Sequence, residues 1–475
     1  MPESKVVLSR RGDGLGERLN SLLNAMRLAE ILDVDFRFSW PIGAVGKDPR
    51  HAITRADEFF SADFVAEHLM ATADARDGFE ELAGPADDLD SLGRQLAAAE
   101  RGLKVPGRPL STRIDPEAVP AVSRGFAAEF EAVGFHPSID AVIAAARAVP
   151  LGAQTAGIHL RAGDNLFGHY RAWTTYWYKV VPVPVARALI LRFQADGSEV
   201  LVFGEDTEAI DDLCATTGAT DASTKRPTTG MSAAEAAMFD LVLLSRCGRI
   251  VSGWSGFAIQ AASISDQSVE HHLDLVPPSD VVALTKADLA LHGDHYDPTH
   301  AGFAWWAAYY GARHELSHEE SMELVRSSLE ADPTNPRARL RLAALSYRAG
   351  RLEQGDDALV DALVADAAAG GVTLESVMLF SLLTVGGYDS AEILDDIELG
   401  ARDGSGPALI YRGALRGQRG EADRARGDVA AFSTYAAGER RLADLPELDR
   451  LATATIDERI RRAGQTGLDR PTGSR

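Results

Sequence analysis

The chain has 475 residues, which is too long for one hydrophobic core, so two or three domains are expected. Hydrophobic residues make up 45% and charged residues 25%, an ordinary balance for a soluble globular protein. The formal net charge of −22 argues against a general nucleic-acid or anionic-membrane binder, because such proteins present basic surfaces.

Two further features bear on the compartment. The N-terminus, MPESKVVLSRRGD, lacks the apolar core of a signal peptide, and no run approaches the ~18 apolar residues of a membrane helix. Only Cys214 and Cys247 occur, so a disulfide framework is not expected. Together these features predict a cytoplasmic protein with no membrane span.

Residues 1–150 are predicted to form an N-terminal α/β lobe. Lys5–Ser9 and Asp35–Trp40 have the composition of strands and flank a helical stretch, Glu17–Leu32, which makes a compact βαβ unit. Helical structure is also expected over Ala56–Arg101, which is rich in Ala, Asp and Glu, and over Ile139–Ala148.

Residues 151–300 are predicted to form a second α/β lobe. Strand-like and helix-like segments alternate there, which implies a parallel sheet with right-handed crossovers. The expected strands are Thr155–Arg161, Glu199–Phe203 and Arg249–Ser252, and the expected helices are Pro182–Phe193, Thr207–Thr216, Ser232–Ser245 and Phe257–Ala262.

Beyond about residue 300 the pattern predicts helices alone. A connecting aromatic helix is expected within 301–320, and an all-α domain over 321–465. The run from Ser321 to Leu363 resembles a tetratricopeptide repeat, with Ala343, Tyr347 and Gly350 near consensus places. Small residues at such places let two antiparallel helices pack closely.

The turn after the first strand contains Gly12, Gly14 and Gly16, the layout of a phosphate-binding turn before a helix. A dinucleotide fingerprint needs its third glycine where Glu17 stands, and the Lys-Ser/Thr pair of a Walker loop is missing. The glycines therefore indicate either a ligand-facing turn or only a tight strand-to-helix connection.

The segment GIHLRAGDN carries the stronger signal. His159 and Arg161 are two residues apart on an expected strand, so they should project from the same face. An arginine at the carboxyl end of a parallel strand lies where open α/β sheets bind ligands, and its planar fork suits a phosphate. The alternatives are an Arg161–Asp164 ion pair that braces the loop, and a hydrogen-bonded core role for His159.

Two more strand ends carry polar residues. Glu205 and Asp206 could meet a ribose, a base edge or a sugar, although Asp206 could instead cap the next helix. Ser252, Ser255 and Gly256 precede another helix, whose first N–H groups make an anion site, with N-capping by Ser255 as the alternative. This turn lacks the second glycine of a nucleophile elbow.

Together these pieces resemble the fucosyltransferase superfamily that uses GDP-fucose, which includes bacterial α1,2-, nodulation α1,6- and protein O-fucosyltransferases. The family's Gly-Gly-Leu-Gly-Asn-Gln start is similar to Gly12–Arg18, and its late Ser-x-Phe turn is similar to Ser255–Phe257. Its His-x-Arg-x-Gly-Asp motif is matched by His159, Arg161, Gly163 and Asp164. The resemblance covers roughly residues 4–40 and 155–265.

The resemblance implies a GT-B-like fold, a pair of Rossmann-like lobes, with an acceptor side in 1–150 and a donor side in 151–300. It also implies an inverting transferase that needs no metal and no cofactor beyond the GDP-sugar co-substrate. Arg161 would bind the donor β-phosphate and stabilise the departing nucleotide diphosphate. The other donor-binding candidates are Gly14, Gly16, His159, Glu205, Asp206, Ser252, Ser255 and Gly256.

An inverting transferase needs a base for the acceptor hydroxyl, and a carboxylate is the usual solution. Asp13 and Asp164 are the candidates. The chain departs from the family at Ala162, where many α1,2 members carry a second arginine, and at Glu17-Arg18 in place of Asn-Gln. These departures bear on the sugar and the acceptor more than on the fold.

Two other clusters have competing interpretations. LHGDHYDPTH holds His292, Asp294, His295, Asp297 and His300 without regular ligand spacing, so a solvated linker is favoured over a metal site. FAWWAAYYGARH could stack on a sugar, but aromatic residues that join the helical domain to the catalytic part are favoured.

The sequence therefore predicts a glycosyltransferase that transfers a sugar, fucose favoured, from a GDP-sugar to a hydroxyl of a glycan, a peptide or a small molecule. The helical domain would bind a protein partner or the acceptor. The alternative is a non-catalytic sugar-binding scaffold that acts through the helical repeats. The presence together of His159, Arg161 and Asp164 argues against that alternative.

Overall fold

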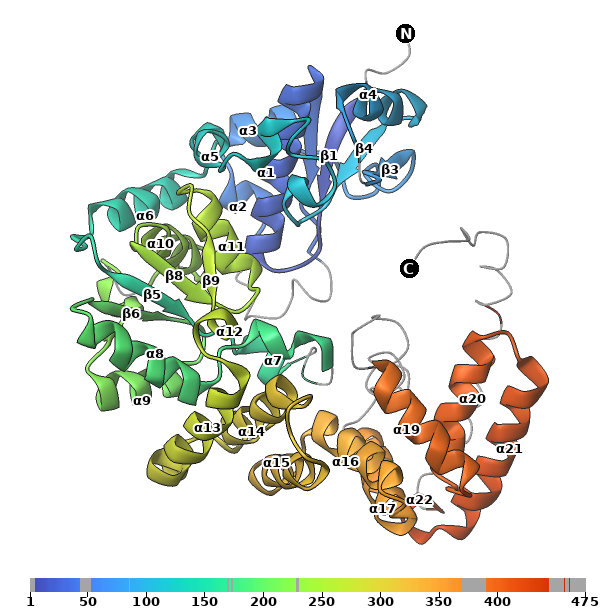
Figure 1. Ribbon diagram of the computed structural model, residues 1–475. Coiled ribbons are helices and arrows are strands. Elements are labelled where there is room, and N and C mark those ends of the chain that lie inside the picture. Colours follow the sequence, from blue (N-terminus) through green and yellow to red (C-terminus); the bar gives the residue numbers. More distant parts are fainter. Residues whose placement is uncertain are drawn as a thin grey trace. The chain divides into compact units, whose positions relative to one another are not determined.

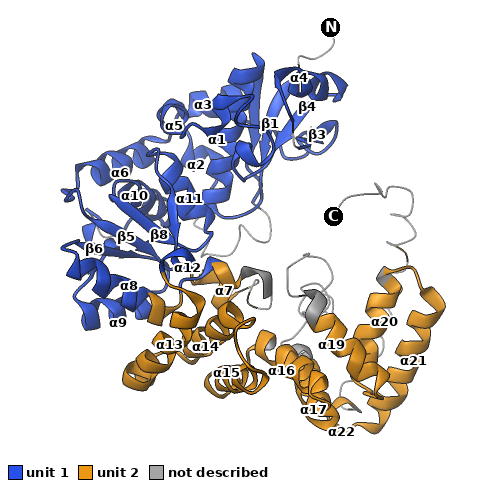
Figure 2. Cartoon of the chain, in the orientation of Figure 1, with its two compact units in different colours: residues 1–161, 179–181, 186–275 blue, residues 162–178, 182–185, 276–475 orange. Residues whose placement is uncertain are grey.

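The structure, a computed structural model, describes residues 5–42, 53–84, 86–168, 171, 174–227, 230–368, 390–443, 457 and 461. The chain forms two compact units (Figure 2). Unit 1 comprises residues 1–161, 179–181 and 186–275, and unit 2 comprises residues 162–178, 182–185 and 276–475. The domain boundaries expected from the sequence stay a prediction, and residues 369–389 and 444–456 of the expected helical domain lie outside the described residues.

Unit 1 contains two parallel β-sheets, as the alternation of strands and helices predicts (Figure 1). The first sheet has the order β2-β1-β4-β3. Its strands are β1 (Val6–Arg10), β2 (Asp35–Ser39), β3 (Phe79–Glu81) and β4 (Gly102–Val105), and its helices are α1 (Leu15–Leu32), α2 (Ala56–Phe59), α3 (Ala62–His68), α4 (Leu89–Ala98) and α5 (Ala127–Ala132).

The second sheet has the order β7-β6-β5-β8-β9, with β5 at its centre. Figure 1 shows α6 and α10 on one side of this sheet and α8 and α9 on the other. The elements are β5 (Ala156–His159), β6 (Val200–Phe203), β7 (Thr220–Asp221), β8 (Arg249–Ser252), β9 (Val269–His271), α6 (Pro137–Ala148), α8 (Val183–Ala195), α9 (Thr207–Thr217), α10 (Ala233–Ser245), α11 (Gly256–Ser263) and α12 (His272–Leu275). This arrangement of two parallel α/β lobes agrees with the predicted GT-B-like fold class.

The described residues of unit 2 form helices and the turns between them, without a strand. It begins with α7 (Gly163–Leu166) and the 3₁₀ helix η5 (Thr174–Lys179), of which Lys179 belongs to unit 1. The longer helices follow in chain order: α13 (Pro278–His292), α14 (Pro298–Ala312), α15 (His318–Ala331), α16 (Pro336–Arg348), α17 (Leu352–Ala368), α19 (Ser390–Arg402), α20 (Ala408–Gln418), α21 (Ala422–Gly438) and α22 (Arg440–Ala443). The helical region expected after residue 300 is thus present, while its assignment to a tetratricopeptide-like repeat stays a prediction.

Two of the expected segments are wrong in detail. Ala56–Arg101 is not helical throughout, because it contains the strand β3 between α3 and α4. The expected strand Thr155–Arg161 is shorter, since β5 pairs with its neighbours only as far as His159. Short strands such as β3, β4 and β9 are held by sheet pairing rather than by a strong local pattern, so composition alone did not mark them.

The two α/β lobes of unit 1 share one apolar core. It includes Leu15, Leu19 and Leu22 of α1 in the first lobe and Met238 of α10 and Ala258 of α11 in the second, all buried. Apolar side chains from both lobes leave water in this one cluster, so burial stabilises the lobes as a pair.

The first turn of α1 packs its backbone directly against the backbone of the second lobe. A Cβ added to Gly16 would lie 2.6 Å from the backbone carbonyl carbon and oxygen of Gly256 at the start of α11. The Asn20 side chain, one turn later in α1, donates a hydrogen bond of 3.3 Å to the Gly256 carbonyl oxygen. Glycine at position 16 therefore allows backbone-to-backbone contact at this point.

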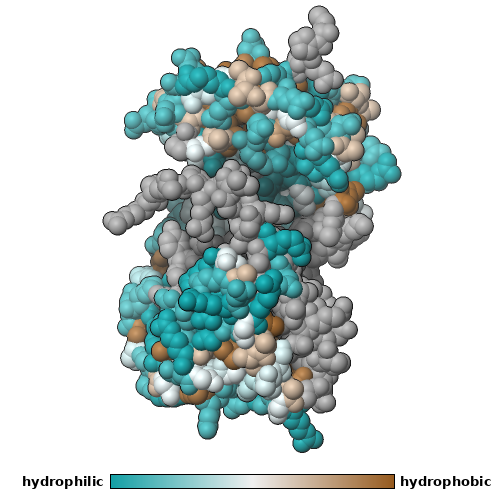
Figure 3. Space-filling model, turned by 90° about the vertical axis from the view of Figure 1, so that its right-hand side faces the viewer, coloured by the Kyte–Doolittle hydropathy of each residue, from teal (hydrophilic) through white to brown (hydrophobic). Residues whose placement is uncertain are grey.

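One face of the molecule is mostly polar (Figure 3). On the face that Figure 3 shows, hydrophilic residues dominate and hydrophobic ones are scattered, in keeping with the net charge of −22. Within the described residues, the structure contains no helix with both the length and the apolar character needed to span a bilayer.

Replacing Gly16 by Ala should destabilise unit 1 by about 1–3 kcal/mol, because the added methyl group overlaps backbone that cannot rotate away. The effect has the opposite sign to the small gain that Gly→Ala gives inside an exposed helix. The matched control is Gly12→Ala, where an added Cβ meets no described atom within 4 Å. Urea unfolding of both variants measures the difference, and equal stability of the two would contradict the close lobe contact.

Candidate active site

The candidate site lies at the carboxyl edge of the second sheet. In the register of this sheet, His159 at the end of β5 stands beside Phe203 of β6 and Ser252 of β8. Because the strands are parallel, the residues that follow each strand emerge at the same edge. The segments after the three strands carry Arg161, Glu205 and Ser255 respectively.

Arg161 lies just beyond β5, in a backbone conformation that few non-glycine residues adopt. Its φ is +50°, in the left-handed region. The prediction that His159 and Arg161 project together from one strand is therefore wrong, because the chain leaves the sheet after His159 and turns. Its side chain is 18% exposed, and the guanidinium forms an ion pair with Glu205, with 3.6 Å between Nη1 and Oε2. A strained, partly open arginine of this kind is typical of a ligand-binding position.

His159 is buried directly behind Arg161. Its ring stacks on Phe257 with 5.1 Å between centroids, and its Nδ1 lies 3.3 Å from the Ser252 hydroxyl oxygen. Burial, together with the positive charge of Arg161, lowers the pKa of His159 to about 3. The imidazole is therefore neutral at physiological pH, and in this position it supports the strand ends, as the core interpretation of the sequence expected.

The turn between β8 and α11 presents an anion-binding geometry. Ser255 occupies the N-cap position of α11 with extended backbone, but its side chain makes no capping hydrogen bond. Its hydroxyl is buried and has no hydrogen-bond partner among the described residues. The preceding Trp254 is 55% exposed, and its ring lies 5.5 Å from that of His271. The hydroxyl and the first N–H groups of α11 are thus arranged for an acceptor that carries negative charge.

Asp206 caps a helix, which was the alternative to ligand binding in the sequence analysis. Its carboxylate accepts a hydrogen bond of 3.1 Å from the Ala209 backbone N–H and caps α9. Glu205, beside it, pairs with Arg161 and is 39% exposed. Of the two acids, Glu205 is therefore better placed to meet a ligand at the sheet edge.

In the first lobe, the glycine turn reaches the same region through α1. Gly14 is the N-cap residue of α1, and Gly16 contacts the backbone at Gly256. Asp13 forms an ion pair with Arg11, while its carbonyl oxygen accepts a hydrogen bond of 2.6 Å from Arg18 Nε. The turn is therefore a tight strand-to-helix connection, and it also faces α11, which borders the candidate site. A tight connection and a ligand-facing turn, the two interpretations of the glycines, are thus compatible.

Glu17 is the acid that the sequence interpretation missed. Its Oε1 would lie 2.8 Å from a Cβ added to Gly256, and its Oε2 lies against Gly107, so the carboxyl group fits between glycine backbones of both lobes. Burial raises the pKa of Glu17, an effect that nearby Arg11 and Lys179 oppose. The sequence showed Glu17 only as a mismatch to a glycine fingerprint; its place after a strand and a glycine turn was the available signal.

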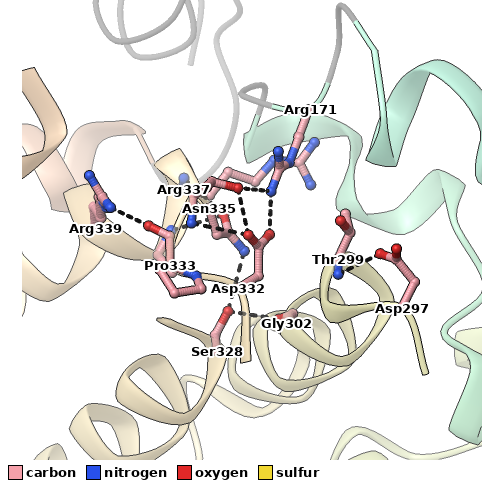
Figure 4. A network of polar contacts seen from close by, with 12 residues as sticks. Arg171, Asp297, Thr299, Gly302, Ser328, Asp332, Pro333, Asn335, Arg337 and Arg339 are labelled. Atoms are coloured by element: carbon pink, nitrogen blue, oxygen red, sulfur yellow. Dashed lines mark hydrogen bonds and ion pairs between the residues drawn. The ribbon is translucent and has the colours of Figure 1, made fainter. Parts of the chain in front are cut away.

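Asp164 belongs to unit 2, where its carboxylate is buried and hydrogen-bonded. It is 1% exposed in α7, and it accepts a hydrogen bond of 3.0 Å from the Asn165 side chain. Farther along the segment, Arg171 pairs with Asp332 between α15 and α16, as Figure 4 shows. Arg337 reaches the Asn165 carbonyl oxygen at 3.5 Å. These contacts tie the segment after the His-x-Arg motif to the helices of unit 2.

The two remaining clusters are largely structural. In LHGDHYDPTH, Asp297 caps α14 by accepting a hydrogen bond of 2.7 Å from Thr299 N–H, and the His300 ring lies 5.5 Å from that of Phe167. Within the described ranges, no three His, Cys, Asp or Glu side chains gather as metal ligands would. Trp306, Tyr309 and Tyr310 are buried in unit 2, which disfavours a sugar-stacking role.

Comparison with known proteins gives structural similarity alone. No protein-family model matches the chain, and no curated protein matches it in sequence. The fucosyltransferase NodZ from Bradyrhizobium is similar at 17% identity and a TM-score of 0.34, over 55% of this chain and 93% of NodZ. NodZ α-1,6-fucosyltransferase soaked with GDP-fucose is similar at 16% identity and a TM-score of 0.34, over 55% of this chain and 93% of that one. A mutant of Arabidopsis thaliana FUT1 in complex with GDP is similar at 14% identity and a TM-score of 0.35, over 56% of this chain and 70% of that one.

The depressed pKa of His159, about 3, makes a prediction for acid stability. An unfolded histidine gains a proton below pH ~6.5, whereas the folded one stays neutral until about pH 3. Stability is therefore lost as the pH falls below ~6.5, by about 2 kcal/mol at pH 5 from this group. Urea unfolding of His159→Asn should show a loss between pH 7 and pH 5 that is smaller by about that amount.

The control for this experiment is His295→Asn, since His295 is exposed. This variant should keep the pH dependence of the unmodified protein. If His159→Asn loses as much stability on acidification as the unmodified protein does, the buried neutral histidine is not responsible.

Proposed function

We propose that the protein is an inverting glycosyltransferase that transfers a sugar, fucose favoured, from a GDP-sugar to a hydroxyl acceptor. The observation that carries this proposal is the position of Arg161. It stands at the carboxyl end of the central strand of a parallel sheet, held at φ +50°, with Glu205 as its ion-pair partner. That edge is where open α/β sheets bind nucleotides.

The proposed site for the diphosphate uses three kinds of donor. The Arg161 guanidinium would exchange its ion pair with Glu205 for a bidentate contact with phosphate oxygens, which is stronger. The buried Ser255 hydroxyl and the first N–H groups of α11 would supply the remaining hydrogen bonds. In an acidic protein with a net charge of −22, such a local arrangement favours a specific anion over general anion binding.

In this proposal the Glu205 carboxylate then accepts hydrogen bonds from ribose or base groups of the donor. His159 and Ser252 would act from behind, since the Ser252 hydroxyl donates a hydrogen bond of 2.9 Å to the His159 carbonyl oxygen. This bond joins β8 to β5 where both strands end. Its proposed role is to keep Arg161 and the α11 turn at a constant separation.

Catalysis would follow from the same contacts. As the bond between the sugar and the β-phosphate breaks, negative charge grows on the leaving diphosphate. A fixed arginine and a helix N-terminus stabilise that charge without reorganising, which is the main way such sites lower a barrier. The family resemblance implies that no metal ion is required for this step.

The remaining parts of the proposal concern partners and compartment. The helices of unit 2 would bind a protein partner or position the acceptor, in the manner of helical repeats. The cytoplasm is the proposed compartment, since Cys214 and Cys247 are both free thiols.

Calorimetric titration with GDP tests the phosphate role of Arg161. Arg161→Ala should weaken GDP binding about 10- to 100-fold, because charged hydrogen bonds to a phosphate are lost. Arg161→Lys should recover only part of the affinity, since an ammonium group lacks the planar fork. Arg55→Ala, which removes an exposed arginine on another surface, is the control and should bind GDP normally.

Catalysis is tested separately by hydrolysis of GDP-, UDP- and TDP-sugars. The expected result is release of nucleotide diphosphate from GDP-fucose in preference to the UDP- and TDP-sugars. Tight GDP binding without turnover of any sugar would favour the non-catalytic sugar-binding alternative. Unchanged GDP affinity in Arg161→Ala would remove the arginine from the site.

A further inference from the structure

One acid at the junction of the two lobes has no part in the donor contacts described so far. The Glu17 carboxyl group lies in the first turn of α1, against Gly107 of the first lobe and Gly256 of the second. Gly256 begins α11, and its neighbour Phe257 stacks on His159, two residues before Arg161. Glu17 is thus joined to the donor edge by a short series of direct contacts within unit 1.

The fold positions this carboxyl group from three sides. The Gly16 backbone packs against Gly256, which prevents the start of α1 from moving away. The Asn20 side chain holds the Gly256 carbonyl oxygen from the next turn. Because Gly107 and Gly256 have no side chains, the Glu17 oxygens occupy space that any Cβ would fill.

The electrostatic surroundings of Glu17 suit a group that exchanges a proton. Among the described residues its oxygens make no hydrogen bond, and burial raises the pKa of the carboxyl group. The charged groups around it are Arg11, Asp13, Arg108 and Lys179, and α11 carries no ionisable side chain. A carboxyl group without fixed donors, near several cations, can lose and regain a proton readily.

The other acids of this region are engaged elsewhere. Asp13 pairs with Arg11, Asp206 caps α9, and Glu205 pairs with Arg161. Asp164 is 1% exposed within unit 2. Glu17 is the acid that both lobes contact and whose oxygens no described donor occupies.

We propose that Glu17 is the general base of the transfer reaction, the group that receives the proton of the acceptor hydroxyl. The proposal rests on the proposed glycosyltransferase function. It replaces Asp13 and Asp164, the candidates that the sequence suggested, on the ground of position and existing partners.

The step balances as a single displacement. The acceptor oxygen forms a bond to the anomeric carbon while the bond from that carbon to the β-phosphate oxygen breaks. The electron pair of the broken bond leaves with the nucleotide diphosphate, whose charge Arg161 receives. The acceptor proton passes to a Glu17 oxygen, and solvent later removes it. The base lies on the first lobe and the leaving group on the second, which suits in-line attack.

The pH dependence of the reaction rate follows from the raised pKa of Glu17. A raised pKa means that Glu17 holds its proton to a higher pH than an ordinary glutamate. Only the ionised form can accept the acceptor proton, so the rate should rise with pH through that pKa and then level off. We call this rise of the rate with pH the acidic limb. A purely structural role for Glu17 would not produce it.

The experiment measures hydrolysis of GDP-fucose, with water as the acceptor, across pH 4–8. Glu17→Gln should lower kcat/KM about 10²- to 10⁴-fold and abolish the acidic limb. Glu17→Asp should recover part of the rate. Asp13→Asn should keep the limb but move it to lower pH, because the Asp13 charge raises the pKa of Glu17. Glu30→Gln, which removes an exposed carboxylate of the same helix, is the control and should keep the limb unchanged. Calorimetry with GDP should give Glu17→Gln an affinity within a few-fold of the unmodified protein.

The outcomes separate this proposal from the one on which it rests. If Glu17→Gln keeps full hydrolysis and the same pH limb, the general-base proposal is wrong while GDP-sugar transfer stands. If the unmodified protein binds no GDP or hydrolyses no donor, both proposals are wrong. Loss of the limb in Asp13→Asn, with Glu17→Gln unaffected, assigns the role to Asp13. Thermal unfolding confirms that each variant is folded, and Glu17→Gln should be no less stable at pH 7, since its buried ionised carboxylate is removed.

Discussion

The candidate site depends on one backbone contact, in which the start of α1 meets the start of α11. Gly16 lies so close to Gly256 that a methyl group at either position would displace the other lobe or the Glu17 carboxyl group. This contact joins two lobes that share one apolar core, and it sets where the opening glycine turn faces. The glycines are therefore explained by the approach of a second helix, rather than by a dinucleotide fingerprint.

On the two sides of this contact the lobes supply groups of opposite kinds. The second lobe supplies Arg161, the Ser255 hydroxyl and the α11 N–H groups, all of which favour an anion. The first lobe supplies Glu17, the proposed general base, whose pKa is raised by burial. The proposed displacement at an anomeric carbon needs this division, since its leaving group becomes negative while its nucleophile loses a proton. His159 is neutral, because burial lowers its pKa to about 3.

The sequence predicted the elements with strong local patterns and missed those held by pairing. The boundaries of β8 and most of those of α1, α9 and α10 follow from apolar runs, capping residues and glycine turns. The short strands β3, β4 and β9 carry little pattern of their own and exist because neighbouring strands complete their hydrogen bonds. Arg161 was identified by type and by motif, but its left-handed backbone required the turn after His159.

The alternation of strands and helices in the two parallel lobes and the helical region that follows were determined by the sequence alone, because periodicity is a local property. The phosphate-binding role of Arg161 stays a prediction. The tertiary structure decided the role of each acid. Asp206 became a helix cap, Asp13 the partner of Arg11, and Glu205 the partner of Arg161. Glu17 lies against a helix more than two hundred residues away in the chain, and a carboxyl group takes its proton affinity from such neighbours and from its burial rather than from adjacent residues.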